Sequence, residues 1–351
     1  MKAQVMRAIG TRRRLPPARS VSLGVLFVIR RASSLVTQPA LARDERWHPL
    51  RISAVRIESG PVETAQPARD AAQVAGRIAR FPDVGGDESA PGERAKRRDP
   101  VLFLHGWGVG PNSYAAPLTA LAGLGCDVLA PAQPGFGGTP ALAGGDCSFA
   151  GYAGWAADYL DQAGVDEPVV VVGHSFGGGV AVQLAHDHPD RVRAVVLCNG
   201  VGGFPWAGPA GTTVASERPW WEWGRHIGAD LFALPGIVRV LPALLGEAVP
   251  NLVHNPLAMW RVGEFVRRAH LLEEIAAVAG RGVPITVVWS DRDRLVPHAG
   301  FSALCGAARV EGEVVPGNHS WLIAEPRRFV DIVLRAMVDA GVVEAALAAT
   351  G

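Results

Sequence analysis

Residues 173–177 read Gly-His-Ser-Phe-Gly and place Ser175 between two glycines. The apolar run Val169–Val172 precedes this stretch and a helical stretch follows it directly. A sharp turn from a strand into a helix strains the serine backbone and exposes its hydroxyl, while the glycines let strand and helix pass closely. The dipole at a helix N-terminus also favours developing negative charge. The pattern is typical of a nucleophile, although a phosphate-binding loop or an ordinary turn is the alternative interpretation.

A serine hydroxyl needs a base to remove its proton, and the base needs a carboxylate to fix its tautomer. His319 lies in the stretch Pro-Gly-Asn-His-Ser-Trp, which follows the last apolar run of the chain. Asp291 and Asp293 follow the run Pro284–Trp289. We therefore expect His319 to be the base and one of the two aspartates to be its partner.

Acyl transfer also requires two N–H donors that face the developing oxyanion. One donor is expected to be the backbone N–H of Phe176, which directly follows the serine. The stretch Leu-His-Gly-Trp-Gly at residues 104–108 comes straight after another apolar run, so the amide of Trp107 is the second candidate. His105 of this stretch is expected to be structural and not a base.

Short apolar runs rich in β-formers alternate with helical stretches from residue 100 onward. Runs that are apolar almost throughout are typical of strands buried on both faces, and strand–helix alternation predicts a mostly parallel sheet covered by helices. Gly164 and Pro189 are expected to end two of the helices. Upstream, Arg51–Ser59 alternates as a half-buried strand would. The predicted strands are Val101–Leu104, Val128–Ala130, Val169–Val172, Val192–Cys198, Pro284–Trp289 and Val310–Val315, and the clearest helices are Phe149–Ala163 and Gly178–His188.

The alternation stops between Cys198 and Pro284, a stretch that holds five of the ten tryptophans. We interpret residues 203–275 as a helical lid inserted over the sheet edge. Its prolines, Pro235, Pro242, Pro250 and Pro256, predict that it is broken into short helices. The side chains expected to contact a substrate are His174, Trp206, Trp220 and Trp260. Packing of the tryptophans within the lid is the alternative.

Residues from about 100 to 340 resemble the α/β-hydrolase superfamily, in the branch that carries a lid. The resemblance implies the roles given above to Ser175, His319, Trp107 and Phe176, and it favours Asp293 over Asp291 as the acid. The α/β-hydrolase core would then comprise residues 51–202 and 276–351, separated by the lid. The segment at residues 131–140 also resembles a family motif, with Ala132 where an aspartate is frequent and Thr139 in place of a serine.

A serine at the elbow excludes the haloalkane dehalogenases and epoxide hydrolases, which use an aspartate there. The sequence favours a carboxylesterase acting on a small hydrophobic substrate, and no metal or organic cofactor is expected. A hydrolase that cleaves the carbon–carbon bond of meta-cleavage products, or an acyltransferase, would use the same residues. A ligand-binding receptor on the same fold is the alternative outside enzymes.

The N-terminal leader, residues 1–50, is expected to be disordered or a targeting segment. Residues 1–99 carry a formal balance of +9 and the remaining residues −8, which together give a net charge of +1. This distribution indicates a basic leader and not a nucleic-acid-binding protein. No apolar run reaches the ~20 residues of a membrane span. The four cysteines are scattered, so free thiols in the cytoplasm are expected, with export through the leader as the alternative.

Overall fold

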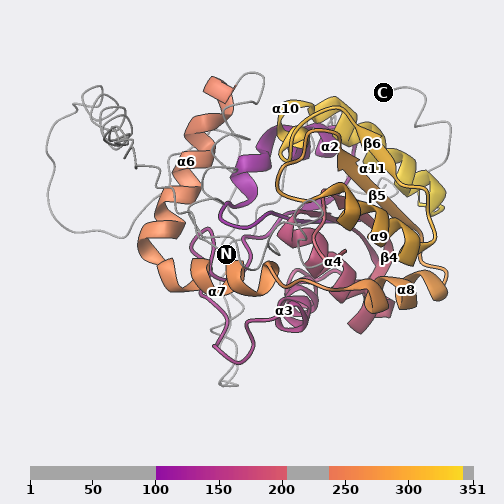
Figure 1. The fold of residues 1–351 in the computed structure, drawn as a ribbon, viewed down its shortest axis with the longest axis horizontal. Helices are drawn as coiled ribbons and strands as arrows, with labels where there is room; N and C mark the ends of the chain where they lie inside the picture. The colour runs from indigo at the N-terminus through magenta and orange to yellow at the C-terminus, as the bar shows by residue number, and fades with distance from the viewer. Residues whose placement is uncertain (1–99, 204–236, 343–351) are drawn as a thin grey trace, which may run out of the picture. The chain divides into compact units, whose positions relative to one another are not determined.

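Six parallel strands form one sheet in the computed structural model, which describes residues 100–203 and 237–342 (Figure 1). Their order across the sheet is β2-β1-β3-β4-β5-β6. The strands are β1 (Val101–Leu104), β2 (Val128–Leu129), β3 (Val169–His174), β4 (Val192–Cys198), β5 (Ile285–Ser290) and β6 (Glu313–Val315). The sequence therefore predicted all six. The expected strand at Arg51–Ser59 and the leader lie outside the described residues.

Helices cover both faces of this sheet. Alternate residues of one strand enter opposite cores: Leu102 and Leu104 of β1 pack in one, Val101 and Phe103 in the other. The first core includes residues of α3 (Phe149–Gln162), α4 (Phe176–Asp187), α8 (Leu272–Gly280) and α9 (His298–Ala308). The second includes residues of α2 (Ala115–Ala122), α10 (Trp321–Ala324) and α11 (Pro326–Asp339). Because both faces of the sheet are buried, the strands do not alternate between apolar and polar residues. The predicted α/β fold class is confirmed.

The helix ends follow the expected signals. The Ser148 hydroxyl accepts a hydrogen bond from the backbone N–H of Gly151 and caps the start of α3. Gly164, with φ of 67°, follows the end of α3, because a left-handed residue stops an α-helix and glycine adopts that conformation without strain. Helix α4 ends at Asp187, and Pro189 opens the short 3-10 helix η3 (Pro189–Arg191).

The prediction that prolines break the inserted segment into short helices was wrong at two positions. Pro242 and Pro250 both lie inside the single helix α6 (Ile237–His254), whereas Pro256 does begin α7 (Pro256–Val266). An interior proline removes one backbone hydrogen bond and costs about 3 kcal/mol. Polar contacts help to hold α6 in place: Glu247 accepts backbone N–H groups of the segment at residues 110–113, and Asn251 accepts the N–H of Gly137 and donates to the carbonyl of Gly108. No helix among the described residues is long and apolar enough to cross a membrane.

Close packing at the turn between β3 and α4 explains the glycines on either side of Ser175. A Cβ added at Gly177 would lie 2.1 Å from the carbonyl oxygen of Leu104, in β1. A Cβ added at Gly173 would lie 2.3 Å from the carbonyl oxygen of Gly177. Both contacts are with backbone, which cannot move aside as a side chain can. Glycine is therefore required where β1, β3 and α4 meet.

We predict that Gly177→Ala lowers the free energy of unfolding by roughly 1–3 kcal/mol, because the methyl group overlaps the β1 backbone. Gly154→Ala is the matched control, since its added Cβ has nothing within 4 Å in the middle of α3. The control should gain about 0.5–1 kcal/mol from reduced backbone entropy. Urea unfolding of the two variants measures both effects, and equal stabilities would contradict the packing argument.

Candidate active site

The candidate residues gather at one edge of the sheet because all six strands run in the same direction. The carboxyl ends of parallel strands meet at one edge, where open α/β sheets bind ligands. The residues that follow these ends are Trp107 after β1, Ser175 after β3, Asn199 after β4, Asp293 after β5 and His319 after β6. Segments that are far apart in the sequence thus contribute to one site.

Ser175 has a left-handed backbone, with φ of 54° and ψ of −116°, and is the N-cap of α4. Its N–H donates to the carbonyl of Cys198 at 3.0 Å, and its own carbonyl accepts from Gly178 at 3.0 Å and Val201 at 3.1 Å. A non-glycine residue in a sparsely populated conformation costs about 1–3 kcal/mol and persists only where the surroundings hold it. The expected strained turn is therefore present, with Ser175 partly exposed between two buried neighbours.

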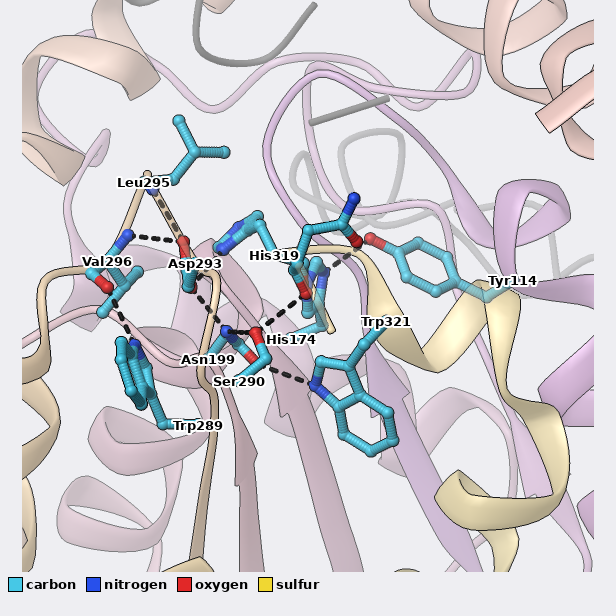
Figure 2. Close-up of polar contacts among 11 residues, drawn as sticks. Tyr114, His174, Asn199, Trp289, Ser290, Asp293, Leu295, Val296, His319 and Trp321 are labelled. Atoms are coloured by element: carbon cyan, nitrogen blue, oxygen red, sulfur yellow. Dashed lines mark hydrogen bonds and ion pairs between the residues drawn. The ribbon is translucent and has the colours of Figure 1, made fainter. Parts of the chain in front are cut away.

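His319 and Asp293 form a hydrogen-bonded pair. The Nδ1–H of His319 donates to Oδ2 of Asp293 at 2.8 Å, and the two side chains are 7% and 0% exposed. The other carboxylate oxygen accepts the backbone N–H groups of Leu295 at 2.7 Å and Val296 at 2.9 Å (Figure 2). Asn199 donates its Nδ2–H to Oδ2 as well. The carboxylate therefore accepts four hydrogen bonds and fixes which nitrogen of His319 carries the proton.

The surroundings of Asp293 keep it ionised. Burial raises the pKa of its carboxyl group, but the charge of His319 and the hydrogen bonds from His319, Asn199 and Val296 lower it by more, and the net shift is downward. Opposing effects of this kind are common at functional sites, where a buried charge needs several donors. The pKa of Asp293 therefore lies below its ordinary value, and the group is a carboxylate at neutral pH.

Asp291 lies outside this pair. Its side chain is 50% exposed, with an ion pair to Arg292 at 3.5 Å, and its Oδ1 accepts the backbone N–H of Gly317 at 2.9 Å. Of the two aspartates considered from the sequence, Asp293 is the one that contacts the candidate base.

Asn199 was missed by the sequence analysis. It has a left-handed φ of 50°, and its Nδ2 donates to Asp293 and to the Ser290 hydroxyl at 2.7 Å. Its Oδ1 accepts the indole N–H of Trp321 at 2.8 Å. The available signal was its position, directly after a predicted strand at the edge that carries the other candidates. Asparagine tolerates the left-handed region better than most residues.

His174 uses both ring nitrogens within the protein. Its Nε2–H donates to the backbone carbonyl of His319 at 2.9 Å, and its Nδ1 accepts the hydroxyl proton of Tyr114 at 2.8 Å. The ring is 3% exposed, and burial, with the nearby charge of His319, lowers its pKa to about 3. Both nitrogens of the neutral ring are thus engaged within the protein, and the predicted contact of His174 with a substrate stays a prediction.

The two expected oxyanion donors lie in the expected segments. Phe176 is the first residue of α4, and amides of the first helical turn have no acceptor within the helix. The Trp107 loop lies against the elbow, since a Cβ added at Gly106 would be 3.5 Å from Cβ of Ser175. The Trp107 indole donates to the carbonyl of Met259 at 2.9 Å, which joins this loop to α7.

His105 is structural, as expected. Its Nε2 accepts the backbone N–H of Gln133 and its Nδ1–H donates to the Gly106 carbonyl, both at 2.9 Å. Burial lowers its pKa to about 4, so this imidazole is neutral and fully occupied.

Trp260 is half exposed on α7 and borders a surface cleft of about 480 Å³. Phe149, Phe265 and Arg261 also line this cleft, but Ser175 does not. The predicted contact of Trp260 with a substrate at the serine therefore stays a prediction. Trp206 and Trp220 lie outside the described residues. In the part of the chain that the structure describes, no three His, Cys, Asp or Glu side chains are grouped to hold a metal ion.

Comparisons with known proteins identify the family of the chain. A sequence model of the alpha/beta hydrolase family matches residues 101–332. The chain therefore belongs to the alpha/beta hydrolase family, and it is a hydrolase by class.

Individual relatives differ in their activities. The dihydrolipoyllysine-residue acetyltransferase component of the acetoin cleaving system from Cupriavidus necator is 32% identical over 272 residues, covering 75% of this chain and 70% of that protein. A 2-hydroxymuconate semialdehyde hydrolase from Pseudomonas putida is 38% identical over 133 residues, covering 35% and 46%.

Solved esterases share the fold. The structure of a thermophilic esterase from Thermogutta terrifontis superposes with a TM-score of 0.53 at 19% identity, covering 75% of this chain and 99% of that one. An esterase from a Rhodococcus species gives 0.56 at 20% identity, covering 75% and 94%.

Proposed function

We propose that this protein is a serine esterase that cleaves carboxylic esters of a small hydrophobic substrate through an acyl-enzyme at Ser175. The observation that carries the proposal is the hydrogen bond between His319 and the buried carboxylate of Asp293, at the same sheet edge as the strained Ser175. In a neutral imidazole whose proton is fixed on Nδ1, Nε2 carries the lone pair that can accept a proton.

In this mechanism Ser175 Oγ attacks the ester carbonyl carbon while its proton moves to Nε2 of His319. The amides of Phe176 and Trp107 would stabilise the oxyanion that forms. The carbon–oxygen bond to the alcohol then breaks, and the alcohol leaves with the proton from His319. Water, activated by the same imidazole, hydrolyses the acyl-serine and regenerates the hydroxyl. Asp293 stays ionised throughout and stabilises the imidazolium.

A fluorophosphonate probe tests the nucleophile directly. We expect covalent labelling of Ser175, detected by mass spectrometry of the modified peptide. Ser175→Ala should abolish labelling and lower the hydrolysis of a chromogenic ester by ~10³-fold or more. Persistence of labelling in this variant would place the nucleophile elsewhere, and a parent protein that hydrolyses neither esters nor a meta-cleavage dienone would favour a receptor.

The two aspartates form a natural pair of variants. In Asp293→Asn, the amide NH₂ must face either the backbone donors of Leu295 and Val296 or the donors of His319 and Asn199. We expect kcat to fall by up to ~10⁴-fold, because the imidazole adopts the wrong tautomer. In Asp291→Asn, the amide oxygen can still accept from Gly317, so kcat should stay within about twofold. A larger loss for Asp291→Asn would overturn the assignment.

The substrate class rests on the proposed lid, residues 203–275, which holds half of the tryptophans. An apolar group of the substrate would be buried beneath it, and each buried CH₂ contributes roughly 0.8 kcal/mol, about fourfold in binding. On a series of acyl esters, kcat/KM should therefore rise with chain length until the pocket is full and then fall. Equal rates on acetate and long-chain esters would remove the pocket role of the lid but not that of Ser175.

Carbon–carbon bond hydrolysis is the second candidate function. The relative that favours it is the 2-hydroxymuconate semialdehyde hydrolase, which is 38% identical over 133 residues. The same panel separates the two, if it includes a meta-cleavage dienone. A kcat/KM for the dienone far above that of every ester would replace the esterase proposal. Transfer of the acyl group to an added thiol or alcohol in preference to water would identify an acyltransferase.

A further inference from the structure

The hydroxyl group of Tyr114 joins two parts of the candidate site. Tyr114 ends the 3-10 helix η2 (Pro111–Tyr114), and its ring is 1% exposed and packs on Phe103 with ring centroids 4.9 Å apart. The hydroxyl accepts the backbone N–H of Gly106 at 3.1 Å and donates its proton to Nδ1 of His174 at 2.8 Å. One buried hydroxyl therefore contacts the residue before Trp107 and the residue before Ser175.

The hydrogen bonds continue from His174 to the candidate base. The Nε2–H of His174 donates to the backbone carbonyl of His319 (Figure 2). The ring centroids of the two histidines lie 4.9 Å apart. A neutral imidazole has one N–H, so donation at Nε2 requires that Nδ1 be the acceptor. The His319 carbonyl, which can only accept, selects that tautomer, and the hydrogen bond donated by Tyr114 to Nδ1 supports it. The pKa of His174, lowered to about 3 by burial, means that the ring keeps one N–H at neutral pH.

Helix α6 fixes the other end of this chain of contacts. The carboxylate of Glu247, a residue that is 9% exposed, accepts the backbone N–H groups of Gly110 and Ser113 at 2.9 Å and of Asn112 at 3.0 Å. It also accepts the Ser113 hydroxyl. The contacts satisfy the amides of Gly110 and Asn112 at the start of η2, and they supplement the 3.3 Å hydrogen bond from the Ser113 N–H to the Gly110 carbonyl. Glu247 therefore holds the segment that places Tyr114.

We propose that Tyr114 is a positioning residue that couples the oxyanion loop at Gly106 to the backbone of His319 through the ring of His174, and that Glu247 of α6 anchors this coupling. The proposal rests on the proposed function, in which His319 is the base and the loop after Gly106 supplies an oxyanion donor. Its chemical consequence is that one hydroxyl sets the distance between the base and the oxyanion donors.

Tyr114→Phe removes the hydroxyl and keeps the buried ring. The direct readout is the imidazole ¹⁵N NMR spectrum of the full chain, which reports the tautomer of each histidine whether or not the protein is an esterase. We expect His174 to keep its Nε2–H tautomer, because the His319 carbonyl still accepts that proton, while its Nδ1 signal moves toward that of a nitrogen without a hydrogen bond and the His319 signals shift. A His174 spectrum unchanged from that of the parent would overturn the coupling.

Kinetics on a chromogenic ester supply the second readout. Misplacement of reacting groups by less than about 1 Å can cost up to ~10²-fold in rate, so we expect kcat of Tyr114→Phe to fall between ~10-fold and ~100-fold with KM within about twofold. Tyr152→Phe is the matched control, because Tyr152 is equally buried and donates to the Pro134 carbonyl at 2.7 Å. It should lose a similar amount of thermal stability but keep kcat within about twofold. Equal kcat losses in both variants, or a rise in KM alone, would indicate a structural role only.

Glu247→Gln perturbs the segment that places Tyr114, because it changes the acceptor on α6. It serves as a second variant if Tyr114→Phe is poorly folded. The NH₂ group that replaces one carboxylate oxygen cannot accept hydrogen bonds from the backbone N–H groups of Gly110, Asn112 and Ser113. We therefore expect a kcat loss of several-fold with little change in KM. Combined with Tyr114→Phe, the losses should be less than multiplicative, because coupled residues are not additive. Multiplicative losses would show that the two act independently and would overturn the anchoring role of Glu247.

Ser175→Ala, assayed in parallel, separates the two proposals. If that variant loses hydrolysis while Tyr114→Phe keeps full kcat, the positioning role fails and the esterase proposal stands. If Ser175→Ala retains hydrolysis, the proposed function fails, and the Nδ1 signal of His174 in Tyr114→Phe still decides whether Tyr114 is coupled to this ring.

Discussion

The structure of the candidate site depends on one buried carboxylate, that of Asp293. A buried charge is costly unless it is hydrogen-bonded, and this one accepts four hydrogen bonds. The donors come from its own loop, from the end of β4 through Asn199 and from the loop after β6 through His319. Satisfying the charge therefore requires three loops to adopt a single arrangement. The orientation of His319 follows from this requirement. The charge of His319 and the hydrogen bonds to the carboxylate also lower the pKa of Asp293 by more than burial raises it.

The strained serine depends on the sheet in a similar way. Ser175 keeps its left-handed backbone because its N–H and carbonyl are both bonded to segments that the sheet holds in place. The sheet in turn is rigid because both of its faces are buried by helices. Glycines at 173 and 177 allow the backbones to approach closely enough for this arrangement. The stability of the core thus sustains a local conformation that would not persist in an isolated peptide.

Much of this could be predicted from the sequence, because buried parallel strands and the elbow have strong local signatures. The ends of the strands were predicted less accurately. The last strand was expected to begin at Val310 but begins at Glu313, since Gly312 adopts a φ of 76°. The continuity of α6 could not be foreseen, because tertiary contacts outweighed the prolines. Asn199 and Glu247 were missed for a related reason. Their partners are mostly backbone amides or single side chains from distant segments, and no sequence motif specifies such contacts.

The order of these segments along the chain affects how the protein acquires its chemistry during synthesis. Domains can begin folding N-terminal part first while the ribosome is still adding residues. The turn that carries Ser175 lies between β3 and α4, near the middle of the chain, whereas His319 follows β6, which pairs only with β5 at the sheet edge. A growing chain can therefore display the serine well before the histidine has left the ribosome. If His319 is the base proposed above, the Ser175 hydroxyl has no base beside it until the edge strand β6 pairs with β5, so a nascent chain would lack the activity of the folded protein.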